Sequence, residues 1–372
     1  MMKDQTLGMK EFGALIGKLV RREDLSTEES EKAFLSLLAD EQTPMQQGAF
    51  LSALTAKGET IEEMTACWKA IYHVDTIKPE ALRGLTLMDN SGTGMDTFKT
   101  FNISTAAAII AAAGGLKMGK HGSRAITSSC GTIDLLEILG VGVEDSPELA
   151  VESIMKTGIG IFNGTSSMVH PKALGRILSQ IAFGTTLNIS ASLANPALPK
   201  WGLRGVYRQD MLEPVAKLMK SIGYEKIMVV YGQVDGSELG MDEASICGTT
   251  QICSVHEDGS IQRTTLRPEE LGLKKARPEE IMPMNDRTQE AMRILRILKG
   301  SDQEGARDAV CLNSGLLFYV AGSAKTIQEG VAMAGALIDS GAAYEKLVSW
   351  VRHQSMEGKG LKQLLSLERN VG

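Results

Sequence analysis

Hydrophobic and polar positions follow two different periods along this chain, and the change falls near Pro79. Between residues 9 and 75, apolar residues recur at helical spacing after polar starts such as Thr43 and Thr60, which predicts consecutive helices. After Pro79, short apolar runs alternate with helical segments, which predicts a largely parallel sheet. Strands are expected near residues 85–89, 116–119, 205–207, 226–231, 250–256 and 260–264.

The predicted fold class is α/β with two domains, a small all-helical N-terminal domain and a larger α/β domain with a mostly parallel central sheet. With 372 residues, the chain is long enough for two substantial cores. Residues 257–285 are rich in charge and proline, and we expect an exposed connecting stretch there. Ligands of open α/β sheets bind outside the carboxyl ends of the strands, so the active site is expected there, between the two domains.

Composition excludes several classes of function. The net charge is −6 with acids and bases interspersed, so we expect no nucleic-acid partner. The longest run of small apolar residues, Ala106–Ala113, is far shorter than the roughly twenty residues of a membrane span, and the N-terminus has no signal-peptide pattern. The five cysteines and five histidines show no zinc-ligand spacing. A cytoplasmic protein with reduced thiols is therefore expected.

The strongest chemical signal lies within residues 87–137. The turn Ser91–Asp96 is rich in glycine, which lets a backbone approach an anion and point N–H groups at it. The segment Asn102–Thr105 then opens a helix of small residues, and helix N-termini favour phosphate. Cations follow in Gly119–Arg124. An ordinary tight turn is the alternative, but the combination predicts a polyphosphate site.

A second signal is acidic. A hydrophobic strand ends near Tyr231, and the polar loop after it carries the adjacent carboxylates Asp242 and Glu243. Mg²⁺ takes a few carboxylates together with water and phosphate oxygens. A solvated acidic loop is the alternative. Beside a bound diphosphate, the pair predicts a magnesium site.

In their order and spacing these motifs resemble the anthranilate phosphoribosyltransferase family, whose pattern runs Gly-Thr-Gly-Gly-Asp, Asn-Ile-Ser-Thr and Lys-His-Gly-Asn-Arg. The resemblance extends to Thr43–Leu51 in the first helices and to Asn313–Gly322 near the end. It implies a helical domain of residues 1–80, to which 170–192 return, and an α/β domain of 81–169 and 193–372 that binds phosphoribosyl diphosphate.

The implied reaction is Mg²⁺-dependent, with one or two ions. The phosphoribosyl group moves from phosphoribosyl diphosphate to the nitrogen of a small aromatic or heterocyclic acceptor, and pyrophosphate leaves. No covalent nucleophile is expected, because the enzyme must mainly stabilise charge on the leaving group and hold the acceptor in line. The resemblance also implies a homodimer through the helical domain, and the helical stripe of Phe12, Leu15, Ile16, Leu19 and Val20 is a candidate contact.

The resemblance assigns residues to a metal group, an acceptor group and a phosphoribosyl-diphosphate group. Three further residues are left open. Asp235 and Glu238 are alternatives to the acidic pair as metal ligands, because a few extra residues precede that pair, and Arg124 is either a ligand or a structural partner of its loop. The metal group is Ser104, Asp242 and Glu243, and the acceptor group is His121, Gly122, Ser123, His170 and Arg176. The phosphoribosyl-diphosphate group is Gly92, Thr93, Gly94, Asp96, Asn102, Ser104, Thr105, Lys120, Ser128 and Thr132.

Departures from the family pattern gather on the acceptor side. Where the family has arginines that hold the anthranilate carboxylate, this chain has Leu178, Ser179 and Gly184, with Arg176 close by; Met95 replaces a glycine of the diphosphate loop. A guanidinium–carboxylate contact contributes about 1.5–3 kcal/mol. Its loss predicts an acceptor other than anthranilate. An authentic anthranilate phosphoribosyltransferase with a rebuilt carboxylate site, or a non-catalytic phosphate-binding homologue, is the alternative.

Overall fold

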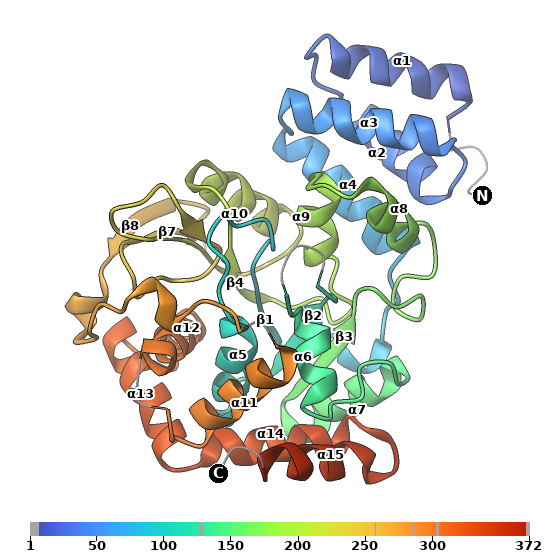
Figure 1. Cartoon of the computed structure of the whole chain (residues 1–372). Helices are drawn as coiled ribbons and strands as arrows, with labels where there is room; N and C mark the ends of the chain where they lie inside the picture. Colours follow the sequence, from blue (N-terminus) through green and yellow to red (C-terminus); the bar gives the residue numbers. More distant parts are fainter. Residues whose placement is uncertain (1–6, 126–128, 257, 285, 303–304, 370–372) are drawn as a thin grey trace.

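A central sheet with helices on both faces carries a separate group of N-terminal helices at one end (Figure 1). The computed structural model describes residues 7–125, 129–256, 258–284, 286–302 and 305–369. The strands are β1 (Met88–Ser91), β2 (Met118–Gly122), β3 (Ile159–Asn163), β4 (Trp201–Gly205), β5 (Lys226–Gln233), β6 (Gly240–Met241), β7 (Thr250–Val255) and β8 (Ile261–Leu266). The helices are α1 (Met9–Val20), α2 (Thr27–Leu38), α3 (Pro44–Lys57), α4 (Ile61–Val74), α5 (Ile103–Ala113), α6 (Thr132–Ile138), α7 (Pro147–Thr157), α8 (Leu174–Ile181), α9 (Thr186–Leu193), α10 (Leu212–Ser221), α11 (Arg287–Leu298), α12 (Gly305–Ala321), α13 (Ile327–Asp339), α14 (Ala342–His353) and α15 (Lys359–Glu368).

The sheet confirms the predicted mostly parallel α/β domain. Its strand order is β3-β2-β1-β4-β5-β7-β8, with β6 beside β5. Strands β1 to β5 pair in parallel, and β6, β7 and β8 are antiparallel additions. The chain runs outward from β1 through β2 and β3 and then returns to the other side of β1 for β4. Strand β1 therefore lies at the switch point of the strand order, where α/β proteins bind ligands.

The N-terminal helices begin where the sequence predicts, because hydroxyl side chains cap them. Ser26, Thr43 and Thr60 each accept a hydrogen bond from the backbone N–H three residues later. The core of this domain is aromatic and aliphatic, with the rings of Phe12 and Phe50 5.1 Å apart. Helix α9 packs on α4, where the Trp68 indole donates to the Leu193 carbonyl at 2.8 Å. The exact domain limits stay a prediction.

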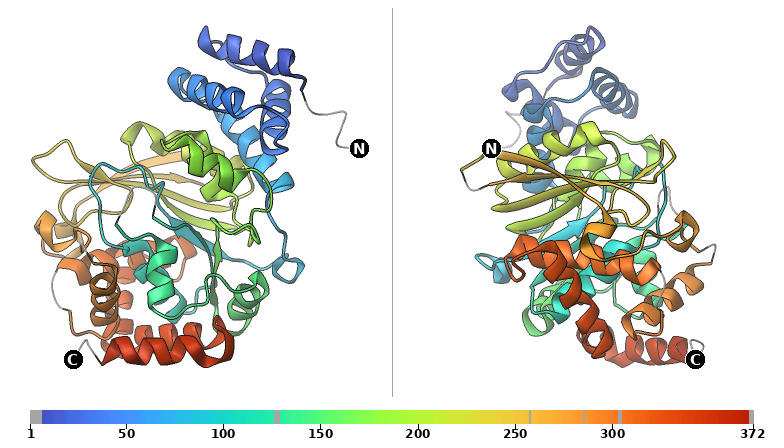
Figure 2. Two further views of the ribbon diagram at one scale, coloured as in Figure 1. Left: turned by 45° about the vertical axis from the view of Figure 1, so that its right-hand side comes forward. Right: turned by 90° about the vertical axis from the view of Figure 1, so that its left-hand side faces the viewer.

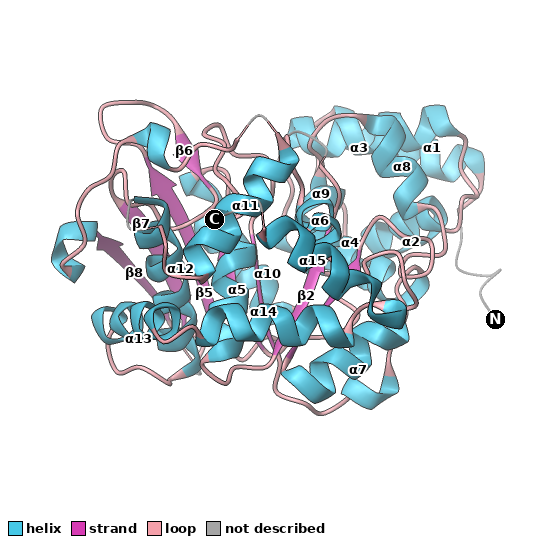
Figure 3. Cartoon of the chain, turned by 60° about the horizontal axis from the view of Figure 1, so that its bottom comes forward, coloured by secondary structure: helices cyan, strands magenta, loops and turns pink. Residues whose placement is uncertain are grey.

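The two faces of the sheet are buried in different surroundings. Residues such as Met88, Leu203 and Met228 pack in the cluster that contains the buried helix α5 and the C-terminal helices α11 to α15. Ile227 and Val229 pack in the cluster that contains α10 and the N-terminal helices. Figures 2 and 3 show the C-terminal helices on the side of the sheet away from α1 to α3. The strand ends at the switch point are thus placed between these two packing layers.

Some sequence expectations were wrong in detail. Strand β3 was missed, and the strand expected at 205–207 is β4 at Trp201–Gly205. The strand expected at 260–264 is confirmed as β8, which lies within the exposed stretch expected at 257–285, and four of its six residues are exposed. In the described part of the chain, no helix combines the length and the apolar character that crossing a membrane requires.

The outer strand β3 is covered by one side chain from the C-terminal helices. The buried Gln354 amide donates to the Ile161 carbonyl at 2.8 Å and accepts from the Ile161 N–H at 3.0 Å. The Trp350 indole also donates to the same amide oxygen, at 2.7 Å. Gln354 therefore satisfies both backbone groups of Ile161, as a neighbouring strand would.

Candidate active site

Side chains at the carboxyl ends of β1, β2 and β4 alternate between the two faces of the sheet. On the α5 face, the buried Lys120 ammonium donates to the backbone and side-chain oxygens of Asn90 at 2.7 and 2.9 Å. The Asn90 amide in turn donates to the Ser104 carbonyl at 2.8 Å, in the first turn of α5. Two predicted ligands, Lys120 and Ser104, are therefore joined through a residue that the sequence analysis did not single out.

The acidic pair lies against the glycine-rich turn. Asp242 accepts hydrogen bonds from the Gly94 N–H at 2.6 Å and the Thr93 hydroxyl at 3.3 Å. Glu243 accepts from the Ser104 N–H at 3.2 Å. A Cβ at Gly92 would lie 2.3 Å from the Asp242 carboxylate, so only glycine fits there. The turn, the start of α5 and the acidic pair thus converge, as the sequence predicts.

These carboxylates share a buried space. Burial, reinforced by the negative charge of Asp242, raises the pKa of Glu243 to about 8 despite the opposing charge of Lys120. Burial and Asp242 likewise raise the pKa of Asp96 to about 7. Burial lowers the pKa of Lys120. Carboxylates that are difficult to ionise together favour a bound cation.

The number of carboxylates suits a Mg²⁺ ion that is shared with substrate phosphates, and is too small for a metal site built from protein ligands alone. Among the described residues, no group of three or more His, Cys, Asp or Glu side chains forms a metal cage. Mg²⁺ is usually held by one or two carboxylates and completed by substrate phosphates and water. Asp242 and Glu243 supply that number, and the buried hydroxyl of Thr105 has no hydrogen-bond partner in the described structure.

The rival acids are placed elsewhere. Residues 234–239 form the tip of the hairpin between β5 and β6. There Asp235 is paired with Lys275 at 2.5 Å, and Glu238 is exposed. The extra residues that precede the acidic pair therefore lengthen this hairpin, while Asp242 and Glu243 remain at the end of the short return strand β6.

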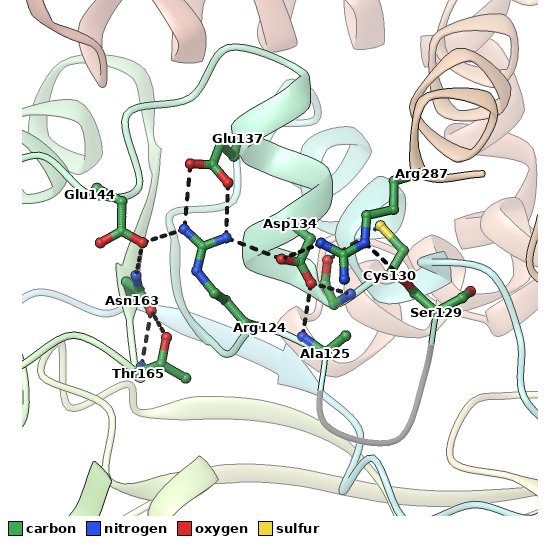
Figure 4. A network of polar contacts seen from close by, with 11 residues as sticks. Arg124, Ala125, Ser129, Cys130, Asp134, Glu137, Glu144, Asn163, Thr165 and Arg287 are labelled. Atoms are coloured by element: carbon green, nitrogen blue, oxygen red, sulfur yellow. Dashed lines mark hydrogen bonds and ion pairs between the residues drawn. The ribbon is translucent and has the colours of Figure 1, made fainter. Parts of the chain in front are cut away.

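Arg124, which follows β2, is held in an ion-pair network (Figure 4). Arg124 contacts Asp134 at 3.1 Å, Glu137 at 2.9 Å and also Glu144. Of the two roles that the sequence left open for Arg124, ligand or structural partner, these three ion pairs favour the structural one. Hydrogen bonds to Glu137 and Glu144 raise the pKa of Arg124 well above its ordinary value.

Other predicted phosphate ligands border the same loop. The Asn102 amide donates to the Cys130 carbonyl at 3.1 Å, so it fastens the loop to the start of α5. Thr132 begins α6, and a Cβ at Gly122 would lie 3.0 Å from its methyl group. The Ser123 carbonyl accepts the Ile133 N–H at 3.2 Å. Ser128 lies outside the described residues.

The opposite face of the strand ends, which we call the helical-domain face, carries Asp89, Ser91, His121 and Arg204. His121 and His170 are buried with their Nε2 atoms 3.0 Å apart. His170 Nδ1 contacts the Asp75 carbonyl, which can only accept, so this nitrogen carries the proton. His121 Nε2 then donates to His170, and a hydrogen bond with the Ser192 backbone acts against the lowering of the His121 pKa.

Both imidazoles are neutral at pH 7. Burial lowers the pKa of His170 to about 4. Burial, together with the nearby His170 and Arg204, lowers the pKa of His121 well below its ordinary value. The two predicted acceptor residues are thus brought together as a neutral, hydrogen-bonded pair.

Arg176 is not brought to this pair. Its guanidinium contacts Asp40 and donates to Gln47 at 2.9 Å, both in the N-terminal helices. At Gly184, one of the family's arginine positions, an added Cβ would lie 2.3 Å from the Met95 sulfur. An apolar side chain from the glycine-rich turn therefore occupies space beside the position where the family carries a cation.

Sequence reasoning missed Arg204, the last polar residue of β4. Only 2 % of it is exposed, and its terminal nitrogens donate to the hydroxyls of Ser91 and Ser192. The available signal was an arginine placed inside a short strand between two glycines, in the sequence Trp201–Gly205. A charged residue at such a position is almost always paired or functional.

Comparison with known proteins agrees with this two-part architecture. Residues 84–344 match the glycosyl transferase family a/b domain, and residues 14–74 match the glycosyl transferase family helical bundle domain. The anthranilate phosphoribosyltransferase of Desulfosudis oleivorans is 34% identical over 354 residues, covering 93% of this chain and 100% of that protein. That of Clostridium kluyveri is 37% identical over 331 residues, covering 89% and 96%.

Solved structures give the same result. The anthranilate phosphoribosyltransferase of Thermus thermophilus superposes with a TM-score of 0.82 at 32% identity, covering 91% of this chain and 99% of that one. The Saccharomyces cerevisiae enzyme in complex with PRPP and Mg shares the fold, with a TM-score of 0.80 at 24% identity over 93% and 98% of the two chains.

The fold and the matched domains define a two-domain glycosyltransferase. The chain belongs to the anthranilate phosphoribosyltransferase family. The predictions of the family and of a phosphoribosyltransferase are therefore confirmed, whereas divergence from the family's acceptor is not shown.

The buried imidazole of His170 should make stability depend on pH. The unfolded chain binds a proton at His170 below about pH 6.5, whereas the folded chain does so only near pH 4. Because the unfolded state then binds more protons, the free energy of unfolding falls as pH drops through this window, by about 2–3 kcal/mol.

Urea denaturation of the native protein and of His170→Gln between pH 4.5 and 7 measures this effect. The variant should lose part of the pH dependence, whereas His256→Gln, which changes an exposed histidine, should keep it. An equal slope for the native protein and His170→Gln would contradict the assignment of a neutral His170.

Proposed function

We propose that this enzyme transfers the phosphoribosyl group of phosphoribosyl diphosphate to the amino nitrogen of anthranilate, with Mg²⁺ as cofactor. The observation that carries the proposal is the convergence of the glycine-rich turn, the α5 start and the Asp242–Glu243 pair at one strand edge. Relatives that are 34–37% identical over about nine tenths of the chain are anthranilate phosphoribosyltransferases, and the structure with PRPP and Mg bound is of a protein with this fold.

The chain's own residues account for the main requirements of the reaction. The turn Gly92–Asp96 and the α5 start would line the diphosphate, where oriented backbone donors stabilise the leaving group's charge. In the described structure the Gly94 and Ser104 N–H groups donate to Asp242 and Glu243, the acids that would turn to the metal. Lys120 supplies a positive charge from the end of β2. Asp242 and Glu243, with the Ser104 hydroxyl, would hold Mg²⁺, which when bound neutralises and orients the phosphates. His121 and His170 border the acceptor from the helical-domain face.

Sequence departures favoured a different acceptor, and this expectation finds no support in the relatives, which favour the alternative of an authentic anthranilate enzyme. One observation keeps a neutral aromatic amine as a second candidate. The arginine positions of the family hold Leu178, Ser179 and Gly184, and Met95 packs at the last of these. An uncharged acceptor would suit that apolar surface.

A turnover assay with purified protein, phosphoribosyl diphosphate, Mg²⁺ and each acceptor separates the two candidates. We expect phosphoribosyl anthranilate to form with a Michaelis constant for anthranilate in the micromolar range. Anthranilamide, which replaces the carboxylate by a neutral amide, should be a poorer substrate. Turnover of anthranilamide or aniline without turnover of anthranilate would overturn the proposal in favour of the second candidate.

The metal assignment is tested by Asp242→Asn combined with Glu243→Gln. Turnover should fall about 100-fold or more, because the charge on the leaving pyrophosphate loses its counter-ion. The matched pair Asp235→Asn and Glu238→Gln, in the adjacent hairpin, should keep turnover within about twofold, as expected of surface changes outside the site. Retention of turnover by the first variant and its loss in the second would reassign the metal site to the hairpin.

The homodimer expected from the family remains a proposal, supported by the surface of the N-terminal helices. Phe12, Leu15 and Leu19 are buried inside the domain. Exposed apolar side chains remain beside them: Met9 is 64% exposed, Val20 69% and Met45 85%. The Gln46 amide donates to the Met9 carbonyl at 2.9 Å, so the starts of α1 and α3 are adjacent. Met9 and Val20 are the two ends of α1, so the outer side of α1 together with the start of α3 is the candidate contact surface.

Sedimentation equilibrium should give a dimer for the native protein and a monomer for Val20→Glu combined with Met45→Glu, because two buried charges oppose association. Leu365→Glu changes an exposed apolar residue of α15, at the other end of the molecule, and should leave the dimer intact. A native monomer at micromolar concentration would refute the proposed dimer surface.

All five cysteines are free and buried, which supports the proposal of a reducing, cytoplasmic setting.

A further inference from the structure

Unpartnered polar atoms gather on the helical-domain face. In the described residues, six buried side-chain nitrogen or oxygen atoms have no hydrogen-bond partner, and three of them belong to Asp89, His121 and Arg204 at adjacent strand ends. Such atoms are costly to bury, so each calls for an explanation. Three together, on the face that borders the acceptor, point to a missing ligand.

Arg204 is built into this face rather than placed on its surface. Its terminal nitrogens donate to Ser91, at the end of β1, and to Ser192, in α9, while its Nε–H is unpartnered. The Ser192 hydroxyl already donates to the Ile189 carbonyl at 2.7 Å. The half-buried Ser91 hydroxyl accepts from Arg204, and its own proton is available to another acceptor. The face thus carries a half-buried O–H donor, Ser91, with the unpartnered N–H and the positive charge of Arg204 buried behind it.

The Arg204 guanidinium interacts with carboxylates, but its Nε–H donates to none of them. Asp89 interacts electrostatically with both Lys120 and Arg204, and one of its oxygens accepts from the Asn195 amide at 3.2 Å. Glu243 also attracts Lys120, and Asp242 also attracts Arg204. Among the described residues the Arg204 Nε–H nevertheless has no hydrogen-bond acceptor, so a ligand carboxylate could supply one.

We propose that Arg204, with the Ser91 hydroxyl that it orients, recognises the carboxylate of the acceptor and takes the role of the family's missing arginines. The proposal rests on the proposed function and names the determinant of its acceptor specificity. Arg204 and His121 interact electrostatically, and both border Ser192.

The ratio of kcat/KM for anthranilate to that for anthranilamide tests this role, because only anthranilate carries the charge. In Arg204→Gln we expect kcat/KM for anthranilate to fall about 10–100-fold, with a much smaller change for anthranilamide, as expected for loss of one charged contact. The KM for phosphoribosyl diphosphate should stay within about twofold. Ser91→Ala should shift the ratio in the same direction, and Arg204→Lys should retain part of the preference because it keeps the charge.

Arg293→Gln is the matched control for the loss of a buried guanidinium. Arg293, in α11, is 7% exposed and donates to the Met282 carbonyl at 2.7 Å. This variant should lose stability without a change in the substrate ratio. If Arg204→Gln fails to fold, Ser91→Ala and Arg204→Lys decide the question through the same ratio.

An unchanged ratio in the folded Arg204 and Ser91 variants, with intact native turnover, would overturn the role of Arg204 alone. A shifted ratio in Arg176→Gln instead would return the role to the residue that the sequence favoured. Absence of anthranilate turnover in the native protein would overturn the proposed function itself, so the two failures are distinguishable.

Discussion

The Asp242 carboxylate occupies the space where a side chain at Gly92 would lie, and the site is organised around this contact. The turn after β1 can pass beneath the acid only because residue 92 has no Cβ, and the Gly94 N–H and the Thr93 hydroxyl then hold the acid in place. The contact joins two segments that are about 150 residues apart in sequence. The next residue, Glu243, accepts from the Ser104 N–H at the start of α5, so the same contact brings together the residues proposed to bind phosphate and metal.

Burial of charge extends this dependence to the helical domain. Arg204 is tolerated at the end of β4 because the Ser192 hydroxyl of α9 accepts a hydrogen bond from one of its nitrogens. His121 is neutral because burial and the nearby His170 lower its pKa. Both partners come from segments outside the sheet. The proposed acceptor half of the site is therefore assembled from two packing layers, whereas the residues proposed to bind phosphate lie on the strand ends, α5 and the acidic pair.

What the sequence could predict follows this division. The glycine turn, the α5 start and the acidic pair are local patterns whose chemistry depends on residues close together in sequence, and they were found. Arg204, the Asn90 link and strand β3 were missed because their surroundings come from distant segments. Strand β3 contains Gly160, where an added Cβ would lie 2.5 Å from the Ala150 carbonyl, so a residue unfavourable for strands is required by close helix packing. Arg176 was favoured because it is near the right place in the helix, but Asp40, 136 residues away, holds its side chain.

The covering of β3 by Gln354 has a consequence for how this protein meets other copies of itself. An outer strand with free backbone groups is a template for uncontrolled pairing between chains. At one margin of the sheet an amide side chain imitates the missing neighbour, and at the other margin β8 presents the polar residues of Ile261–Leu266 to solvent. Both margins are therefore less favourable for pairing with a further strand than a flat apolar edge would be. An association through helical surfaces, such as the proposed dimer, can pair once and stop, whereas backbone ladders can grow without limit.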